Sequence, residues 1–409
     1  MISSKPLTAL INSLPRLALV CLATACVVPT HAAVTWQNIQ FGGFASQGYL
    51  KSTNNNYPVD TKDGTFDFRE YAVNASTTFG NHFRVGGQLF GQSFGKYGND
   101  KVILDWAVAD YNFAQEFGIR VGRVKYPRSL HSDVLDADVL RPFIFLPQSM
   151  YDARLRDFQA SFDGAMIYGS VGAGQSTFDY KVYYGKIPMK TDSGVADYFN
   201  TSSLFKNPPG LSSMGMDSVR GATIAWGTPI AGLRFAGYYS ELAHFLVSGP
   251  FAAIPSLTSS IDLTKAKFTA ASAEYTKDKW TFAGEYMVEY EDTLLTLPSF
   301  IAPPSVGKGG SKDYYVSVAR RLTDKLEIGT YYSNTHNSYP SATALPSSNK
   351  RNDWTISGRY DFTDHLLFKL EVHFINGTKD IFNVPGIVNT PASLKDSMTL
   401  IAAKTTFSF

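Results

Sequence analysis

The stretch Leu366-Leu-Phe-Lys-Leu-Glu-Val-His-Phe374 decides how this chain folds. Its apolar side chains recur at every second position, and Lys369, Glu371 and His373 occupy positions between them. Successive side chains of a β-strand point to opposite faces, so this period of two predicts a strand with one apolar and one polar face. Helical spacing does not fit the stretch.

The same alternation recurs along the chain, most clearly at 280–290, 325–335 and 353–362. When weaker segments are included, the pattern predicts about sixteen strands. They lie near residues 38–50, 66–79, 82–94, 101–113, 117–125, 159–171, 176–186, 217–227, 231–242, 266–277, 279–290, 313–322, 325–335, 352–362, 366–376 and 398–409.

The connections between these strands alternate in length. Short ones lie at 80–81, 114–116, 228–230, 278 and 323–324. Long ones lie at 51–65, 126–158, 187–216, 243–265, 291–312, 336–351 and 377–397, and a shorter one at 95–100 is the exception. Short turns at one end and long loops at the other are typical of a barrel with periplasmic turns and extracellular loops. The pattern predicts an all-β fold, a transmembrane antiparallel β-barrel of about 16 strands.

The N-terminus indicates a cleavable secretory signal peptide at 1–32, which leaves 33–409 as the barrel. It carries Lys5 and Arg16, an apolar run at 17–28, and then Thr-His-Ala before the expected cleavage site. That run is too short for a membrane helix and no later run approaches ~20 residues, which excludes a helical membrane protein. Both cysteines lie inside the signal, so a disulfide-stapled secreted domain is also excluded.

Removal of the signal leaves a formally neutral chain. The 37 basic residues minus the two in the signal equal the 35 acidic residues, none of which lies in the signal. Without a net positive charge, the composition does not favour nucleic acid as a partner. Any charge selectivity must therefore come from where the charges lie.

A soluble secreted β-sandwich or propeller would also show short alternating strands, but two features favour a membrane barrel. Aromatic residues gather at strand ends beside the short turns, as in a membrane-interface girdle. These pairs are Tyr111 with Phe113, Trp280 with Phe282, and Tyr360 with Phe362. The last strand ends on Phe409, and a terminal Phe on an alternating strand resembles the signal that the barrel assembly machinery recognises.

With about sixteen strands, a neutral mature chain, terminal Phe409 and a long connection at 126–158, the sequence resembles the Gram-negative outer-membrane general porin family. The likeness covers essentially the whole mature chain and is one of architecture, with little fixed local motif. In that family the third extracellular loop folds inward and narrows the pore, and 126–158 is the third long-side connection here. The resemblance implies a homotrimer in contact with outer-membrane lipid and lipopolysaccharide. Each barrel would hold a water-filled channel for passive diffusion of small hydrophilic solutes and ions.

Side chains opposite the apolar series are expected to line the lumen. In hydrocarbon such charges would each cost roughly 2–4 kcal/mol, so an interior wetted by water is favoured. The expected wall residues are Glu70, Arg234, Glu285, Arg359 and Lys404.

The pore constriction is expected within 126–158. Ser132 is expected to begin a short helix that ends near Leu140, before Pro142. Opposed charges at a narrow point set ion preference in pores. The charges expected to face each other are Asp133, Asp136 and Asp138 of the loop and Arg84, Arg120 and Arg123 of the wall.

The same loop is richer in basic residues than the mostly acidic loop of a general porin, since it carries Arg128, Arg141, Arg154 and Arg156. Guanidinium groups in a narrow channel attract phosphate, sulfate or carboxylates, so an anion-selective channel is an alternative function. A second interpretation is that Arg154 and Arg156 pair with Asp152 and Asp157 and hold the loop down.

No catalytic site, cofactor or metal is expected. Ser129, His131 and Asp133 alternate in the loop, but no strand-to-helix elbow or oxyanion feature accompanies them. His131 with the nearby acids lacks the spacing of a calcium loop. Polar loops such as 336–351 leave open a third class, a plugged-barrel adhesin or surface receptor, which bilayer conductance would separate from a porin.

Overall fold

The computed structural model describes residues 38–340, 344–381, 387, 389 and 394–409. The chain separates into two units, Met1–Ile39 and Gln40–Phe409, and the second holds the barrel. The signal peptide predicted at 1–32 lies outside the described residues.

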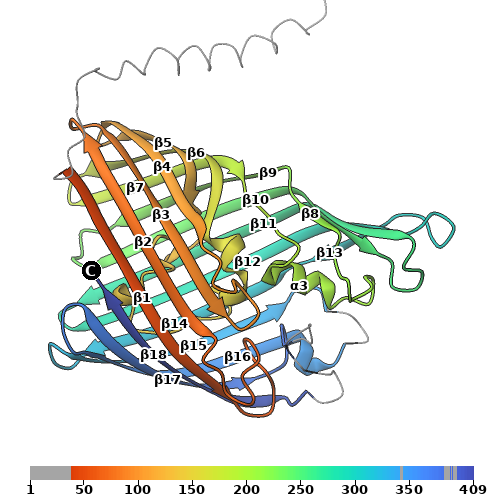
Figure 1. Ribbon diagram of the computed structural model, residues 1–409. Coiled ribbons are helices and arrows are strands. Elements are labelled where there is room, and N and C mark those ends of the chain that lie inside the picture. Colours follow the sequence, from red (N-terminus) through yellow and green to blue (C-terminus); the bar gives the residue numbers. More distant parts are fainter. Residues whose placement is uncertain (1–37, 341–343, 382–386, 388, 390–393) are drawn as a thin grey trace, which may run out of the picture. The chain divides into compact units, whose positions relative to one another are not determined.

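Within the described residues, sixteen long strands follow one another around a closed antiparallel barrel (Figure 1), which confirms the predicted fold class. They are β1 (Ile39–Ser52), β2 (Phe68–Phe79), β3 (Phe83–Phe94), β4 (Ile103–Ala114), β5 (Phe117–Lys125), β6 (Ser161–Ala173), β7 (Ser176–Lys186), β9 (Ser218–Gly227), β10 (Leu233–Pro250), β11 (Thr258–Lys277), β12 (Trp280–Thr296), β14 (Ser311–Arg321), β15 (Leu326–Asn337), β16 (Lys350–Asp361), β17 (Leu366–Asn376) and β18 (Ser397–Ser408). Each pairs with the next in this order, and β18 pairs with β1 to close the ring. Two short strands, β8 (Ser213–Gly215) and β13 (Ser305–Gly309), pair with β10 and β12.

Three strands extend further than the sequence predicts. β10, β11 and β12 contain 18, 20 and 17 residues, so parts of 243–265 and 291–312, expected as loops, are strand. Figure 1 shows β10 and β11 reaching beyond their neighbours at one end. The pairing between them is interrupted at His244 and Thr264. Such an irregularity shifts the alternation of side chains, which hides the continuation of a strand from a pattern of period two.

The two faces of each strand differ in polarity, as the alternation predicts. On β17, Lys369, Glu371 and His373 are at most 1% exposed, whereas Leu370 and Phe374 are 47% and 52% exposed. The polar face therefore points into the barrel and the apolar face points outward. An apolar outer band is what contact with hydrocarbon requires.

The helices are short. They are η3 (Ser132–Val134), η4 (Asp138–Leu140), η5 (Ala153–Leu155), α2 (Arg156–Ala160), α3 (Gly194–Asn200) and η6 (Pro346–Asn349). The single helix expected from Ser132 to Leu140 is wrong, because the stretch forms two separate 3₁₀ turns. The Ser132 hydroxyl accepts from the N–H groups of Arg128 and Ser129, which precede it, so it does not cap a helix. No helix in the described ranges is long and apolar enough to cross a membrane.

Buried apolar side chains gather where residues 126–160, the connection from β5 to β6, meet the strands. One cluster includes Tyr126 and Phe158, and a second includes Phe145 with Phe68 of β2. This connection, called the 126–160 segment below, is therefore packed rather than free in solvent.

Candidate functional site

The 126–160 segment is bound to strands far from its own ends. The N–H of Leu130 donates to Glu285 of β12 at 2.9 Å. The N–H groups of residues 144 and 145 donate to the two carboxylate oxygens of Glu371 on β17, each at 3.0 Å. The inward-facing side chains of β12 and β17 make these bonds, so the segment lies on the inner side of the barrel wall.

Asp138 joins the segment to β17 and β18. Its side chain accepts from Lys369 Nζ at 3.0 Å and from the Thr406 hydroxyl at 2.7 Å. Arg141 and Lys404 lie 3.6 and 3.8 Å from the same carboxylate. Burial alone would raise the pKa of Asp138, but the surrounding cations Lys369, Lys404 and Arg141 lower it far below its usual value. The carboxylate is therefore charged at neutral pH and holds η4 against this wall.

Asp136 belongs to a second network, on the wall formed by β4 and β5. Arg156 Nε and Lys125 Nζ each lie 2.8 Å from its oxygens. The same two cations reach Asp105 of β4 at 2.7 and 3.0 Å. Burial would raise the pKa of Asp136, but Arg156 and Lys125 lower it well below the ordinary range. Two buried acids, the buried Arg156 and the partly exposed Lys125 thus balance each other and fix the segment to β4 and β5.

The apolar run Phe143–Leu146 also packs on the wall. Phe143 meets Tyr331 of β15 edge-on at 5.0 Å between ring centroids, and Phe145 stacks on Phe68 of β2 at 5.2 Å. All four residues of the run are at most 4% exposed. Exposure of such a run to water would cost free energy in proportion to its apolar area, so it holds the segment in place.

Arg84 and Arg120 face the interior. Both line a cavity of about 330 Å³ together with Asp133 and Asp136. Arg120 forms its ion pair with Asp110 of β4, at 2.6 Å, and not with an acid of the segment. Arg84 has no carboxylate within 4 Å in the described part of the chain, so it is the uncompensated cation of this wall.

Asp133 also lines this cavity, and its side chain is 62% exposed. It pairs with Lys181 of β7 at 2.7 Å. Lys181 was not among the predicted residues, and nothing in the local sequence of β7 indicates which loop residue it meets.

The prediction that Arg123 faces the pore is wrong. Arg123 is three residues from Arg120, so the two side chains point to opposite faces of β5. Its guanidinium donates to both oxygens of Asp163 on β6, at 2.7 and 3.0 Å, on the face that also exposes Val121. Strict use of strand alternation would have placed Arg123 correctly.

The arginines of the segment are engaged with other groups. Arg154 pairs with Asp152 at 2.5 Å, as one interpretation expected. Burial would raise the pKa of Asp152, but Arg154 lowers it to about 2. Arg156 binds the Asp136 network, so its predicted pairing with Asp157 is wrong. Arg141 donates to the carbonyl of Leu135 at 3.0 Å, besides its contact with Asp138.

The five predicted wall residues all form polar contacts. Lys404 pairs with Glu70 at 2.5 Å, Arg359 donates to the carbonyl of Val139 at 2.7 Å, Glu285 accepts from Tyr315 at 2.9 Å, and Arg234 lies 3.5 Å from Asp179. Three of the five also lie beside the segment: Arg359 and Glu285 bind it directly, and Lys404 lies 3.8 Å from Asp138.

Asp105 and Lys125 were missed by sequence reasoning. The pairing of β3 with β4 shifts between Gln88 and Leu89, so Asp105 and Asp110 both lie inside although they are five residues apart. A bulge reverses the faces of a strand, and no residue pattern in the sequence predicts the bulge between β3 and β4.

Ser129, His131 and Asp133 have separate partners. The Ser129 hydroxyl bonds that of Ser132 at 2.9 Å, and Asp133 pairs with Lys181. Burial and the charge of Arg141 lower the pKa of His131 to about 4. In the described ranges, no group of three or more His, Cys, Asp or Glu side chains is placed to hold a metal ion.

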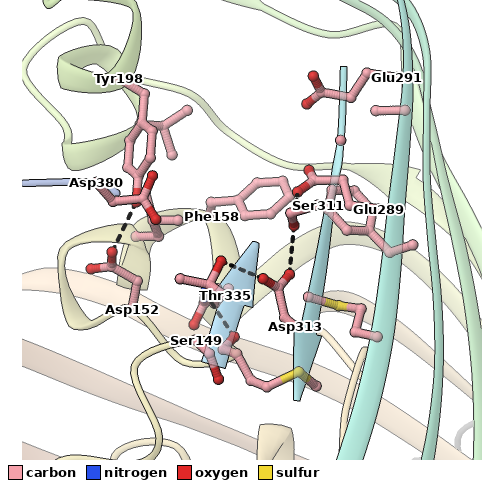
Figure 2. A pocket seen from close by; sticks show the side chains of 18 of the residues that line it. Ser149, Asp152, Phe158, Tyr198, Glu289, Glu291, Ser311, Asp313, Thr335 and Asp380 are labelled. Carbon is pink, nitrogen blue, oxygen red and sulfur yellow. Dashed lines mark hydrogen bonds between the residues drawn. The ribbon is translucent and has the colours of Figure 1, made fainter. Parts of the chain in front are cut away.

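A second cavity, of about 300 Å³, lies between residues 148–159 and the inner faces of β10 to β15 (Figure 2). Its acidic lining includes Glu289 and Glu291 of β12 and Asp313 of β14. The two large cavities therefore border different parts of the segment, one toward β2 to β5 and one toward β10 to β15.

The fold is shared with solved outer-membrane proteins. The chain is similar to Salmonella typhi OmpF in complex with daunomycin (TM-score 0.57, 12% identity), to an anion-selective porin from Comamonas acidovorans (0.54, 11%) and to the trimer form of in-vitro folded OmpT, an outer membrane protein of Vibrio cholerae (0.52, 14%). Each alignment covers 91% of this chain and 97%, 99% and 99% of the other chain, respectively. No protein-family model and no curated protein matches the sequence. At these identities the likeness shows the fold, which is that of outer-membrane porins.

Proposed function

We propose that this chain is a porin of a Gram-negative outer membrane, which forms a water-filled channel for passive diffusion of small hydrophilic solutes and ions. The observation that carries the proposal is the division of a closed ring of strands into a charged inner face and an exposed apolar outer face. Such a barrel is stable in lipid only if the charges lie inside, where water reaches them. The fold shared with porins supports the same function.

The 126–160 segment is proposed as the constriction of this channel. Its support is its attachment to three parts of the wall, by Asp138 with Lys369 of β17, by Arg156 with Asp105 of β4, and by Leu130 with Glu285 of β12. Because β4 and β12 lie nearly across the ring from each other, a segment tied to both would narrow the water path between them. Arg84 and Asp133 are then the charges that a passing ion would meet beside the segment.

The anion-selective alternative draws less support from the contacts. Arg154 and Arg156 are each bound by a carboxylate, so their charges are balanced and are not available to a passing anion. Of the charges that border the segment toward β2 to β5, we therefore expect Arg84 to affect ion preference most. Reversal potential across a salt gradient in planar bilayers measures this preference.

A homotrimer is proposed from the outer face of β2 to β6. Ala75, Gly87 and Ala107 lie directly opposite one another across β2, β3 and β4, and Arg123 with Asp163 continues the row on β5 and β6. Small side chains allow close approach of a second barrel. A charged pair facing hydrocarbon is costly, whereas an interface between copies would cover it. Light scattering in detergent should give the mass of three chains.

Single-channel conductance tests the channel directly. The refolded barrel should show stepwise openings, and deletion of residues 131–140 should raise the unitary conductance because it removes η3 and η4. An unchanged conductance in this deletion variant would exclude the segment as the constriction. A folded barrel with no openings at all would favour the plugged adhesin or receptor.

A further inference from the structure

The cavity between the segment and β10 to β15 has one acidic wall. Figure 2 shows Glu289, Glu291 and Asp313 on this wall. In the part of the chain that the structure describes, none of the three has a basic nitrogen within 4 Å. The hydroxyls of Ser311 and Thr335 donate to Asp313 at 2.6 and 2.5 Å, which orients this carboxylate without neutralising it. This wall therefore favours a cation.

Lys379 is the lysine that lines the same cavity, and its ion pair is with Asp380 rather than with the acidic wall. It lies 2.9 Å from Asp380, which also lines the cavity. The three acids of this wall thus outnumber the one lysine that lines the cavity.

Arg128 supplies a second, independent feature. It lines the cavity, is 6% exposed, and has no carboxylate within 4 Å in the described ranges. Its guanidinium lies over the rings of Phe158 and Phe268, with distances of 5.7 and 5.2 Å to the centroids. Its Nε has no hydrogen-bond partner. Its Nη2 donates to the sulfur of Met287 at 3.4 Å, a weak acceptor. In the described ranges this buried guanidinium therefore lacks a carboxylate and leaves one N–H unbonded, which favours an acceptor brought by a ligand.

Apolar side chains cover much of the remaining surface. Phe158 extends into the space beside Ser311 and Glu289 in Figure 2. Leu242, Phe245 and Leu263 contribute from β10 and β11. Small-molecule sites commonly combine such an apolar lining with a few oriented polar groups, and about 300 Å³ is at the lower end of their volumes.

We propose that this cavity binds a small zwitterion with an apolar body, in the class of short peptides with an apolar side chain. The ammonium group would face Glu289, Glu291 and Asp313, the carboxylate would face Arg128, and the side chain would lie against Phe158. The inference names a solute class for the proposed channel and rests on that function for its use in transport.

Other ligand classes match fewer of these features. An inorganic cation would satisfy the acidic wall but would leave Arg128 and the apolar lining unused. An apolar anion would meet Arg128 but would be repelled by three carboxylates. A neutral sugar would carry no charge to pair with either the acidic wall or Arg128.

Binding can be measured without transport. The mature barrel, folded in detergent, is titrated calorimetrically with alanyl-phenylalanine, with its C-terminal amide and with its N-acetyl form. These three probes have nearly the same size and the same apolar side chain. The zwitterion should bind at least tenfold more tightly than the N-acetyl form, which lacks the ammonium, and more tightly than the amide, which lacks the carboxylate. Equal affinities would overturn the inference.

Substitutions assign each contact. Glu289→Gln with Glu291→Gln should remove the advantage of the free amine over the N-acetyl form, and Arg128→Met should remove the advantage of the free acid over the amide. Glu274→Gln on β11, outside the cavity lining, is the matched control and should change neither. Heat-modifiable mobility verifies that each variant is folded. If a variant does not fold, the affinities of the three probes for the unmodified barrel test the inference on their own.

The outcomes also separate this inference from the channel. A barrel that conducts ions but shows no binding of the three peptides overturns the zwitterion site and keeps the porin. A barrel that binds the zwitterion through Arg128 and Glu289 but never conducts keeps the site and overturns the channel.

Discussion

Asp138→Asn should destabilise the attachment of the 126–160 segment. Asp138 is 1% exposed and Lys369 is fully buried, with Nζ 3.0 Å from the carboxylate. Loss of one partner from a buried ion pair costs about 3–5 kcal/mol, because the other charge stays buried. Lys369 would keep the carbonyls of Asp138 and Phe143 at 2.6 and 3.3 Å, so we expect about 3 kcal/mol, the lower end of that range.

The assay is urea-induced unfolding of the barrel in lipid vesicles, followed by tryptophan fluorescence, with single-channel recording on the same protein. A cost of about 3 kcal/mol lowers the ratio of attached to detached segment by a factor of more than about 100. The urea concentration at the midpoint of unfolding should be lower in the variant than in the unmodified protein. The open-channel current of the variant should also fluctuate more than that of the unmodified protein.

Two further variants control this experiment. Asp133→Asn removes the same charge from the same segment, but that pair with Lys181 is exposed, so it should cost less than about 1 kcal/mol. Asp138→Asn combined with Lys369→Met should recover most of the loss, since both charges are then absent. The reasoning about this buried pair is refuted if Asp138→Asn lowers the free energy of unfolding no more than Asp133→Asn does. It is also refuted if adding Lys369→Met to Asp138→Asn lowers the free energy of unfolding further.

Three other outcomes are expected. The pKa values of Asp136 and Asp138 are depressed below the ordinary 3.8, so the stability that these groups contribute is present above that value and is lost only as the pH falls through the lower folded-state values. Unitary conductance should therefore stay constant from pH 7 to about pH 4, and a rise within that range would count against the two networks. Arg84→Ala should shift the reversal potential toward cation preference, whereas Arg123→Ala on the outer face should not; similar shifts in both would show that Arg123 reaches the channel after all. Deletion of Phe409, whose backbone bonds to β1 at 3.0 and 3.1 Å, should reduce the amount of heat-modifiable barrel in the outer membrane, and normal assembly would argue against its role.

The strands were predictable because their information is local. Alternation at 366–374 separates Lys369 and Glu371 from Leu370 and Phe374 whatever the rest of the chain does, and the structure has the same two faces. A bulge adds one residue to a strand, however, and so shifts the alternation of period two to the other face. The predicted end of β10 is wrong at the irregularity beside His244, and the shift between Gln88 and Leu89 hid the inward position of Asp105 on β4.

The sequence by itself therefore determined a closed barrel of sixteen strands, its polar lumen and the long connection after β5. Only the tertiary structure decided which charges meet. Asp138 lies 231 residues from Lys369 and 268 from Thr406, and Asp136 pairs with Arg156 rather than with the wall arginines that were expected. Local periodicity indicates which face of a strand a side chain lies on. An ion pair across a barrel depends instead on the curvature of the ring, on the register of all the strands between the two residues and on the path of the segment. No short stretch of residues encodes these three properties.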